Sequence, residues 1–439
     1  MNKALFLIPS LLCSSFVQAD TLQEAIHTTL KTNPDVLASI SERQAVSKEI
    51  DQAQAGYFPT IDLGLGTGWE STDNPASRNR GDGEIHLNRD EASLNLRQML
   101  YDGSLTKNEV ERQKARTDSR AHSVYSVAEN TALEATEAYL NVLRRQKLVE
   151  LAQTNLESHL RTHDQITLRS ERGVGRRADM DQSLGRLALA ETNLMAEQSN
   201  LRDAETNYLR VVGEAPSSLS QPPSPEPFLP MTVEEAVNIA IQNHPTLRSA
   251  QADVASANAQ HDVTKAAFLP RVDFELGTRN DHDIDGVRGT DKDVTAMFRL
   301  RYNLLNGGKD KARREETAFL INQAAEIRNN THRQVEQSVR LSWNALETVR
   351  RQMSYFEEYA AAAEKTRDAY QQQFNFGQRT LLDLLDSENE LFRARIALTN
   401  AQYDEIFTMY RVLNSIGLLL ESLEIIAPAA ATTVADNRK

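Results

Sequence analysis

The sequence predicts a mainly α-helical protein with a small β part, in which one helix–strand design occurs twice. Two stretches, 104–172 and 309–376, contain neither glycine nor proline, and a continuous helix of that length measures roughly 100 Å. Each half of the chain also changes from a helical to an alternating apolar pattern at a proline, Pro59 in the first half and Pro270 in the second. These prolines lie 211 positions apart and their neighbours keep the same offset, which indicates an internal two-fold repeat.

The N-terminal segment 1–19 has the pattern of a signal peptide. A basic start and an apolar stretch precede small residues at Val17 and Ala19, which form a cleavage site before Asp20. The alternative is a short buried helix. The single cysteine, Cys13, follows a leucine, and because a lipoprotein signal needs a small residue there, we expect no lipid anchor. No later run of 18 apolar residues predicts a transmembrane helix.

The first repeat is assigned to 20–212. Its helices lead to Pro59, which ends the helical region because proline disfavours the α conformation for the residue before it. Strands are predicted at about 60–70 and 91–101 with a polar loop between them. A long helix follows, breaks at Gly173-Val174-Gly175 and continues to about 212. A linker at 213–230 holds six of the thirteen prolines.

The second repeat, 231–420, follows the same order. Helices lead to Pro270, strands are predicted at about 271–278 and 293–304, and a polar loop at 279–292 joins them. The second long helix breaks at Gly377, and a last helix precedes a flexible tail at 421–439. Both of these helices carry apolar residues at heptad spacing, which predicts helix–helix packing: Leu346, Val349, Met353, Phe356, Ala360 and Ala363 on one, Leu384, Leu391, Ala394, Leu398 and Ala401 on the other.

The predicted strands suit a membrane. Each has about 8–11 residues, enough to cross a bilayer at the tilt of a barrel. Strands in lipid must close on themselves, and four strands are too few, because about eight is the practical minimum. Several copies must therefore associate: two would give eight strands and three would give twelve. The alternative is a soluble periplasmic coiled-coil scaffold capped by two hairpins.

The stretch from Gly377 to Asp386, GQRTLLDLLD, followed by a helix with Leu391, Ala394 and Tyr403, resembles the TolC family of trimeric outer-membrane export channels. The first-half counterpart, 175–181, matches less closely. The resemblance implies a homotrimer whose 12-stranded β-barrel sits in outer-membrane lipid and continues as a coiled-coil α-helical tunnel in the periplasm. It also implies a passive duct, driven by an inner-membrane ABC transporter or other pump through a periplasmic adaptor (membrane fusion) protein.

The resemblance also implies a gate at the periplasmic tip. Asp383 and Asp386 match the family's acidic ring, which would give six carboxylates around the trimer axis and favour cations. Arg379 matches an arginine that latches the tip helices, with Asp181 as its partner. Phe374 stands where the family's best-known member has a latching tyrosine, so that hydroxyl is missing here.

Other patterns give no second site. Asp281-His282-Asp283-Ile284-Asp285-Gly286 begins like a calcium loop, but Lys292 occupies the position that requires an acid, so ordinary turn chemistry is expected. The nine histidines lack metal spacing, and no nucleophile or nucleotide motif is present. The net charge of −13 argues against nucleic acid as a partner. We therefore expect no enzyme activity, catalytic residue, cofactor or metal.

The sequence thus predicts the outer-membrane channel of a tripartite export system, acting in type I secretion of proteins, with large adhesins as one candidate cargo. Multidrug or small-molecule efflux is the alternative within the same family.

Overall fold

The computed structural model describes residues 21–434. The predicted signal peptide at 1–19 and the end of the tail lie outside the described residues. The chain divides into two compact units, and each takes segments from both sequence halves. The helical unit comprises 21–37, 126–244 and 335–428; the sheet unit comprises 38–125, 245–334 and 429–434.

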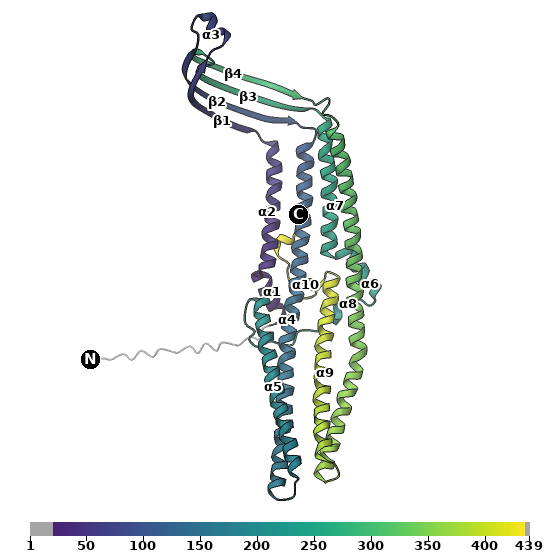
Figure 1. Ribbon diagram of the computed structural model, residues 1–439. Helices are drawn as coiled ribbons and strands as arrows, with labels where there is room; N and C mark the ends of the chain where they lie inside the picture. Colours follow the sequence, from purple (N-terminus) through teal and green to yellow (C-terminus); the bar gives the residue numbers. More distant parts are fainter. Residues whose placement is uncertain (1–20, 435–439) are drawn as a thin grey trace, which may run out of the picture. The chain divides into compact units, whose positions relative to one another are not determined.

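The elements follow the same order in both halves (Figure 1), except that the short helix α3 occurs only in the first and the short helix α10 only in the second. The first half contains α1 (Leu22–Thr32), α2 (Pro34–Gln54), β1 (Thr60–Thr72), α3 (Pro75–Arg80), β2 (Ile85–Tyr101), α4 (Leu105–Glu171) and α5 (Arg177–Val212). The second half contains α6 (Val233–Asn243), α7 (Pro245–Val263), β3 (Arg271–Ile284), β4 (Val287–Arg301), α8 (Lys309–Asn375), α9 (Leu381–Ser415) and α10 (Leu419–Ser422). Helices α4 and α8 have 67 residues each.

The four strands form one antiparallel sheet in the order β1-β2-β3-β4. The strands have 13, 17, 14 and 15 residues, so the predicted bounds were too short at the loop end. The polar stretch 279–292, expected as a loop, is strand except for a tight turn at 285–286, and all of 85–90 belongs to β2. Polar residues on both faces erase the alternation by which strands are recognised, although their backbones still pair. Strand β4 ends at Arg301, before the expected 304.

Both changes from helix to strand occur at a proline. In the first, a 3₁₀ turn at Ala55–Tyr57 leads to Pro59, and β1 begins at the next residue. In the second, a 3₁₀ turn at Thr264–Phe268 leads to Pro270 and β3. The residue before each proline is extended, as the proline ring requires. The chain therefore leaves the helix at a fixed position relative to the strand register.

The core of the helical unit lies between its helices. Ala360 and Ala363 of α8 pack with Leu391 and Ala394 of α9, so the two heptad patterns meet as expected. Two buried tyrosines fix the Pro-rich linker: the hydroxyl of Tyr139 on α4 donates to the Ser220 carbonyl at 2.7 Å, and that of Tyr410 on α9 donates to the Pro223 carbonyl at 2.8 Å. The linker has little regular structure, but these two hydrogen bonds anchor it to α4 and α9.

Candidate functional site

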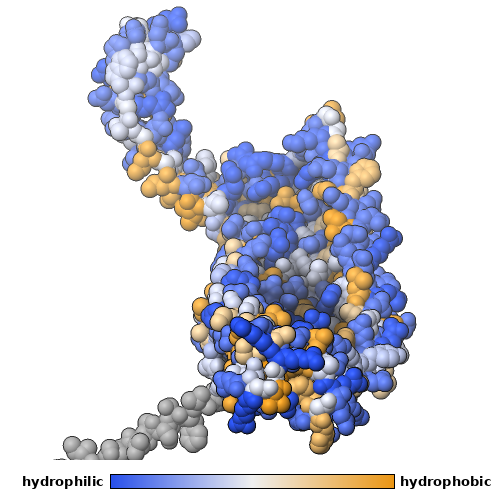
Figure 2. All heavy atoms as spheres, turned by 60° about the horizontal axis from the view of Figure 1, so that its bottom comes forward, coloured by the Kyte–Doolittle hydropathy of each residue, from blue (hydrophilic) through white to orange (hydrophobic). Residues whose placement is uncertain are grey.

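The sheet has one apolar face, and that face is exposed. Strand register places Ile61, Leu96, Leu276 and Ala296 in one row across the four strands. Eight of the larger apolar side chains of this face have 41% to 78% of their surface exposed: Ile61, Leu63, Leu65, Leu94, Leu276, Val294, Phe298 and Leu300. Figure 2 shows apolar and hydrophilic atoms segregated along the strands, with the α3 end mainly hydrophilic. A contiguous exposed apolar surface of this kind marks a site that contacts lipid or another protein.

The opposite face of the sheet is polar. Gly64, Gly66 and Gly68 follow one another at alternate positions of β1, and they pair with Ser93, Glu91 and Arg89 of β2. Gly277 and Thr295 pair with each other in the row of Asp62 and Asn95. Charged residues occupy the two ends and, at Asp62, Arg279 and Asp293, also the middle of this face. The sheet therefore has the division expected of a wall between lipid and an aqueous lumen.

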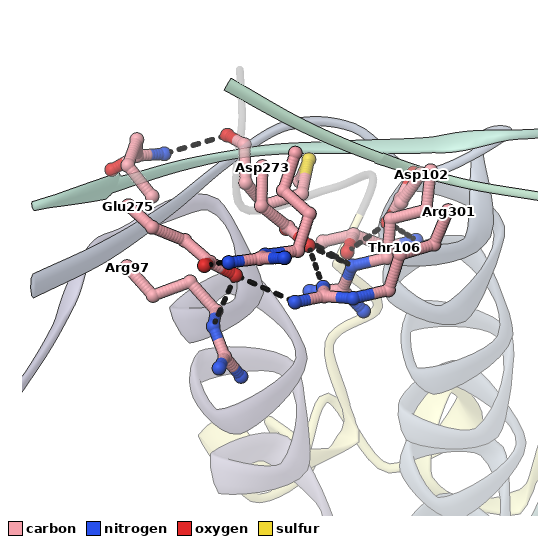
Figure 3. Close-up of polar contacts among 10 residues, drawn as sticks. Arg97, Asp102, Thr106, Asp273, Glu275 and Arg301 are labelled. Atoms are coloured by element: carbon pink, nitrogen blue, oxygen red, sulfur yellow. Dashed lines mark hydrogen bonds and ion pairs between the residues drawn. The ribbon is translucent and has the colours of Figure 1, made fainter. Parts of the chain in front are cut away.

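A network of ion pairs crosses the polar face beside the start of α4 (Figure 3). Glu275 accepts hydrogen bonds from Arg299 Nε at 2.7 Å and Arg301 Nη2 at 2.6 Å, and Arg97 Nε lies 3.5 Å from it. The fully buried Asp273 accepts from Arg301 Nη1 at 2.6 Å. These contacts join three strands.

The start of α4 is fixed next to this network. The carboxylate of Asp102 accepts hydrogen bonds from the backbone N–H of Thr106 at 2.8 Å and from its hydroxyl at 2.6 Å. The turn before it contains Gly103 at φ 69°, where an added Cβ would lie 2.8 Å from Leu269 Cβ. Glycine is therefore required where β2 turns into the helix.

Two helical hairpins turn at the same end of the helical unit (Figure 1). Helix α4 ends at Glu171 and α5 begins at Arg177; α8 ends at Asn375 and α9 begins at Leu381. Gly173 and Gly377 adopt left-handed conformations, with φ of 74° and 73°. The glycine breaks of the two halves thus take the same backbone form, which glycine adopts without steric cost.

Asp383 caps the start of α9. Its carboxylate accepts from the Thr380 hydroxyl at 2.8 Å and from the Thr380 backbone N–H at 3.3 Å, while its own N–H donates to the Thr380 hydroxyl. These hydrogen bonds, the hydroxyl first, lower the pKa of Asp383. The carboxylate is therefore ionised at neutral pH.

Asp386 joins two helices. Its carboxylate accepts a 2.6 Å hydrogen bond from Arg186 Nη2 on α5. Asp383 and Asp386 both line a groove of about 440 Å³ between α8 and α9, together with Tyr359, Tyr370 and Glu390. The two aspartates thus share one surface of the tip.

Arg379 makes its contacts within the same hairpin. Its Nε donates to Gln373 Oε1 at 2.9 Å, and its guanidinium lies 4.2 Å from the centre of the Tyr370 ring. Its Nη1 lies 3.9 Å from Asp383. Over residues 21–434 no hydrogen bond or ion pair joins Arg379 to Asp181, which is exposed. One chain does not bring the predicted latch pair together.

Phe374 belongs to the core of the tip. Only 6% of it is exposed, and it packs with Ile166, Leu381, Leu384 and Leu385. The guanidinium of Arg169 on α4 lies 5.0 Å from its ring centre. The ring therefore contributes apolar packing between α4, α8 and α9 and a cation–π contact.

A buried polar group in the tip was missed from the sequence. Glu388 on α9 is 4% exposed and accepts a 2.7 Å hydrogen bond from Ser158 on α4, while His159 Nδ1 lies 3.6 Å from its other oxygen. Burial lowers the pKa of His159, against the opposing effect of Glu388. Glu388 lies between Leu384 and Leu391 at heptad spacing, so an acid in the apolar seam was the signal that could have revealed it.

The acidic stretch 281–286 forms the end of β3 and the tight turn into β4. The carboxylate of Asp283 accepts a 2.7 Å hydrogen bond from the Gly289 N–H, and Arg279 Nε lies 3.1 Å from the buried Asp281. In the described part of the chain no three histidine, cysteine or acidic side chains converge as metal ligands would. Likewise, none of the helices in 21–434 is long and apolar enough to cross a membrane.

Comparison with known proteins decides the family. The family model described as "Outer membrane efflux protein" matches residues 25–214 and 236–412. The chain belongs to the outer membrane efflux protein family. The two matched segments begin 211 positions apart, at the offset of the two prolines. The duplication seen in the sequence is therefore the repeat of this family.

Relatives in the outer membrane efflux protein family cover almost the whole chain. Outer membrane efflux protein BepC of Brucella suis is 26% identical over 94% of this chain and 89% of its own length. Outer membrane protein TolC of Escherichia coli is 24% identical over 93% of this chain and 84% of its own. Alkaline protease secretion protein AprF of Pseudomonas aeruginosa is 25% identical over 92% of this chain and 86% of its own length.

Solved structures show the same fold. The Campylobacter jejuni CmeC outer membrane channel superposes with a TM-score of 0.77 at 15% identity, covering 91% of this chain and 86% of that one. CusC superposes with a TM-score of 0.75 at 16% identity, covering 93% of this chain and 95% of that one. The resemblance to TolC, the predicted fold class and the outer-membrane location are confirmed. Family membership also establishes a transport channel and not an enzyme.

Proposed function

We propose that three copies of this chain form a passive duct for type I secretion of proteins across the outer membrane. The amphipathic sheet carries the proposal: eight large apolar side chains are exposed on one face, and the other face is polar. Lipid would cover the first face and water the second. Three sheets of four strands would close a 12-stranded barrel, so that the edges β1 and β4 pair with neighbouring copies.

Energy would come from elsewhere. The partners are an inner-membrane ABC transporter, or another pump, and a periplasmic adaptor protein that docks at the tip. Asp383 and Asp386 of three copies would form the acidic ring of the gate. Arg379 would latch the tip by pairing with Asp181 of a neighbouring copy, since Asp181 is exposed.

Protein cargo is supported by two observations. AprF, PrtF of Dickeya chrysanthemi and CyaE are similar to this chain, and the first two are named for protease secretion. Gly64, Gly66 and Gly68 also leave β1 without side chains at three successive positions of the polar face. Small-molecule efflux is the second candidate, because BepC is named an efflux protein and covers the chain to a similar extent.

Deletion of the gene distinguishes protein secretion from small-molecule efflux. We expect the culture supernatant of the deletion strain to lose one or a few proteins, which return with the wild-type gene, while susceptibility to antibiotics and dyes stays unchanged. An unchanged supernatant with raised susceptibility would instead establish efflux. In the same strains, recovery of the chain as a water-soluble monomer would contradict the barrel and favour the periplasmic scaffold.

A further inference from the structure

The charges on the polar face of the sheet are unevenly distributed, with arginines in excess at one end and acids in excess at the other. At the end next to α4, three successive rows contain four arginines and two acids: Arg271 opposite Arg301, Asp273 opposite Arg299, and Glu275 opposite Arg97. At the loop end, Glu91, Asp281 and Asp291 form one row across three strands. Between the two ends lie one row with Asp62, Asn95, Gly277 and Thr295 and one with Gly64, Ser93, Arg279 and Asp293. The three arginine-rich rows therefore have a surplus of two positive charges per chain.

We propose that Arg97, Arg271, Arg299 and Arg301 form a basic belt that concentrates anions, including acidic polypeptide segments, in the lumen. The inference depends on the proposed function, because it requires the polar face to line a water-filled barrel. The surplus would amount to six positive charges in a trimer. Guanidinium groups suit this role because each can bind a carboxylate through two parallel hydrogen bonds.

The burial of the network supports the belt. Both acids are largely buried: Asp273 has none of its side chain exposed and Glu275 has 19% exposed. The four arginines cover them, with 43% to 56% of each side chain exposed. A solute in the lumen would therefore meet guanidinium groups first. Two arginines would be enough to neutralise Asp273 and Glu275. Charge pairing between strands therefore accounts for only two of the four arginines.

Arg97 is the member most available to a ligand. Its contact with Glu275 is 3.5 Å, against 2.6 Å and 2.7 Å for Arg301 and Arg299, and its side chain is the most exposed of the four. Replacing Arg97 leaves both short contacts of Glu275 intact. Conversely, without Glu275, Arg301 keeps its 2.6 Å contact with Asp273. Charge can thus be changed in both directions while most of the network stays in place.

The experiment measures ion selectivity in planar bilayers under a KCl gradient. The dilute side should be about 10 mM, where the Debye length is about 30 Å and reaches across the lumen. Arg97→Gln halves the surplus charge of the trimer, and we expect the K⁺/Cl⁻ permeability ratio to rise by about a factor of two. Glu275→Gln raises the surplus, and the ratio should fall. Both shifts should disappear near 1 M salt, where the Debye length is about 3 Å.

Lys292→Gln is the matched control, since Lys292 lies on the opposite, apolar face; it should leave the ratio unchanged. A second readout is block by short oligoglutamate and oligolysine peptides, where Arg97→Gln should weaken only the oligoglutamate block. Trimer migration on an unheated gel checks the fold of each variant. Channels that conduct with the same permeability ratio in both charge variants would overturn the belt. If the wild type itself forms no channel, the proposed function fails first.

Discussion

The carboxylate of Glu129 on α4 accepts a 3.1 Å hydrogen bond from the backbone N–H of Leu420 in α10. A second bond comes from the Leu419 N–H at 3.2 Å, and Glu129 is only 2% exposed. Burial raises the pKa of Glu129 to about 7, against the effect of these hydrogen bonds, with a further small increase from Glu421. A single acid thus holds the C-terminal turn against the long helix.

This acid should make stability depend on pH. The pKa of Glu129 in the folded protein lies above its value in the unfolded chain. The free energy of unfolding therefore falls by about 3 kcal/mol in all as pH rises from 4.5 towards 7. We expect Glu129→Gln to remove most of this loss, so that melting temperatures at pH 5 and pH 8 converge. The exposed Glu134 on the same helix is the control, and Glu134→Gln should melt like wild type. Equal pH dependence in wild type and Glu129→Gln would contradict the assignment.

Phe374 should stabilise the tip through packing. Truncation to alanine leaves a cavity among Ile166, Leu384 and Leu385 and is expected to cost about 3–5 kcal/mol. Phe376, two residues on, is 80% exposed, and Phe376→Ala should cost less than about 0.5 kcal/mol. Hydrogen exchange of the α8–α9 hairpin measures both. Equal exchange in the two variants would show that the ring is not part of the tip core.

The aspartate pair should bind multivalent cations. We expect Asp383→Asn with Asp386→Asn to weaken block of single channels by a trivalent cation at least tenfold, because six carboxylates leave the ring. Asparagine keeps an acceptor for the cap at Thr380. Stability should change little, since the partly exposed Arg186–Asp386 pair contributes about 0–1 kcal/mol. Glu358, exposed on α8 outside the groove, provides the control variant Glu358→Gln. Undiminished block would reject the acidic ring.

The latch can be tested by exchanging its charges. Arg379→Ser should raise the resting conductance, and so should Asp181→Arg alone. The double variant Arg379→Asp with Asp181→Arg should restore a low conductance if the two side chains pair between copies. Gln373→Ala serves as the control for the contact within the hairpin. If the double variant conducts like the sum of the single ones, Arg379 closes the tip through Tyr370 or another neighbour.

The sequence alone predicted the order and breaks of the helices and strands, but it did not predict the contacts between side chains distant in sequence. The two prolines, the glycine breaks and the heptad seams predicted the joints, the hairpins and the packing of α8 on α9, because each rests on local conformation or periodicity. Strand ends were missed at 85–90 and 279–284, where polar residues occupy both faces. The Arg97–Glu275 network and the Arg186–Asp386 pair depend on strand register and on contacts between helices distant in sequence, which no local pattern encodes.

The two outer strands of the sheet have a consequence for biogenesis. Strands β1 and β4 run for 13 and 15 residues with one edge each unpaired within the chain. A newly exported polypeptide would present both edges, beside a surface rich in leucine and valine, to every other chain it meets. Escort by a holdase chaperone until insertion follows from this arrangement, and overproduction beyond the supply of that chaperone should lead to aggregates in transit.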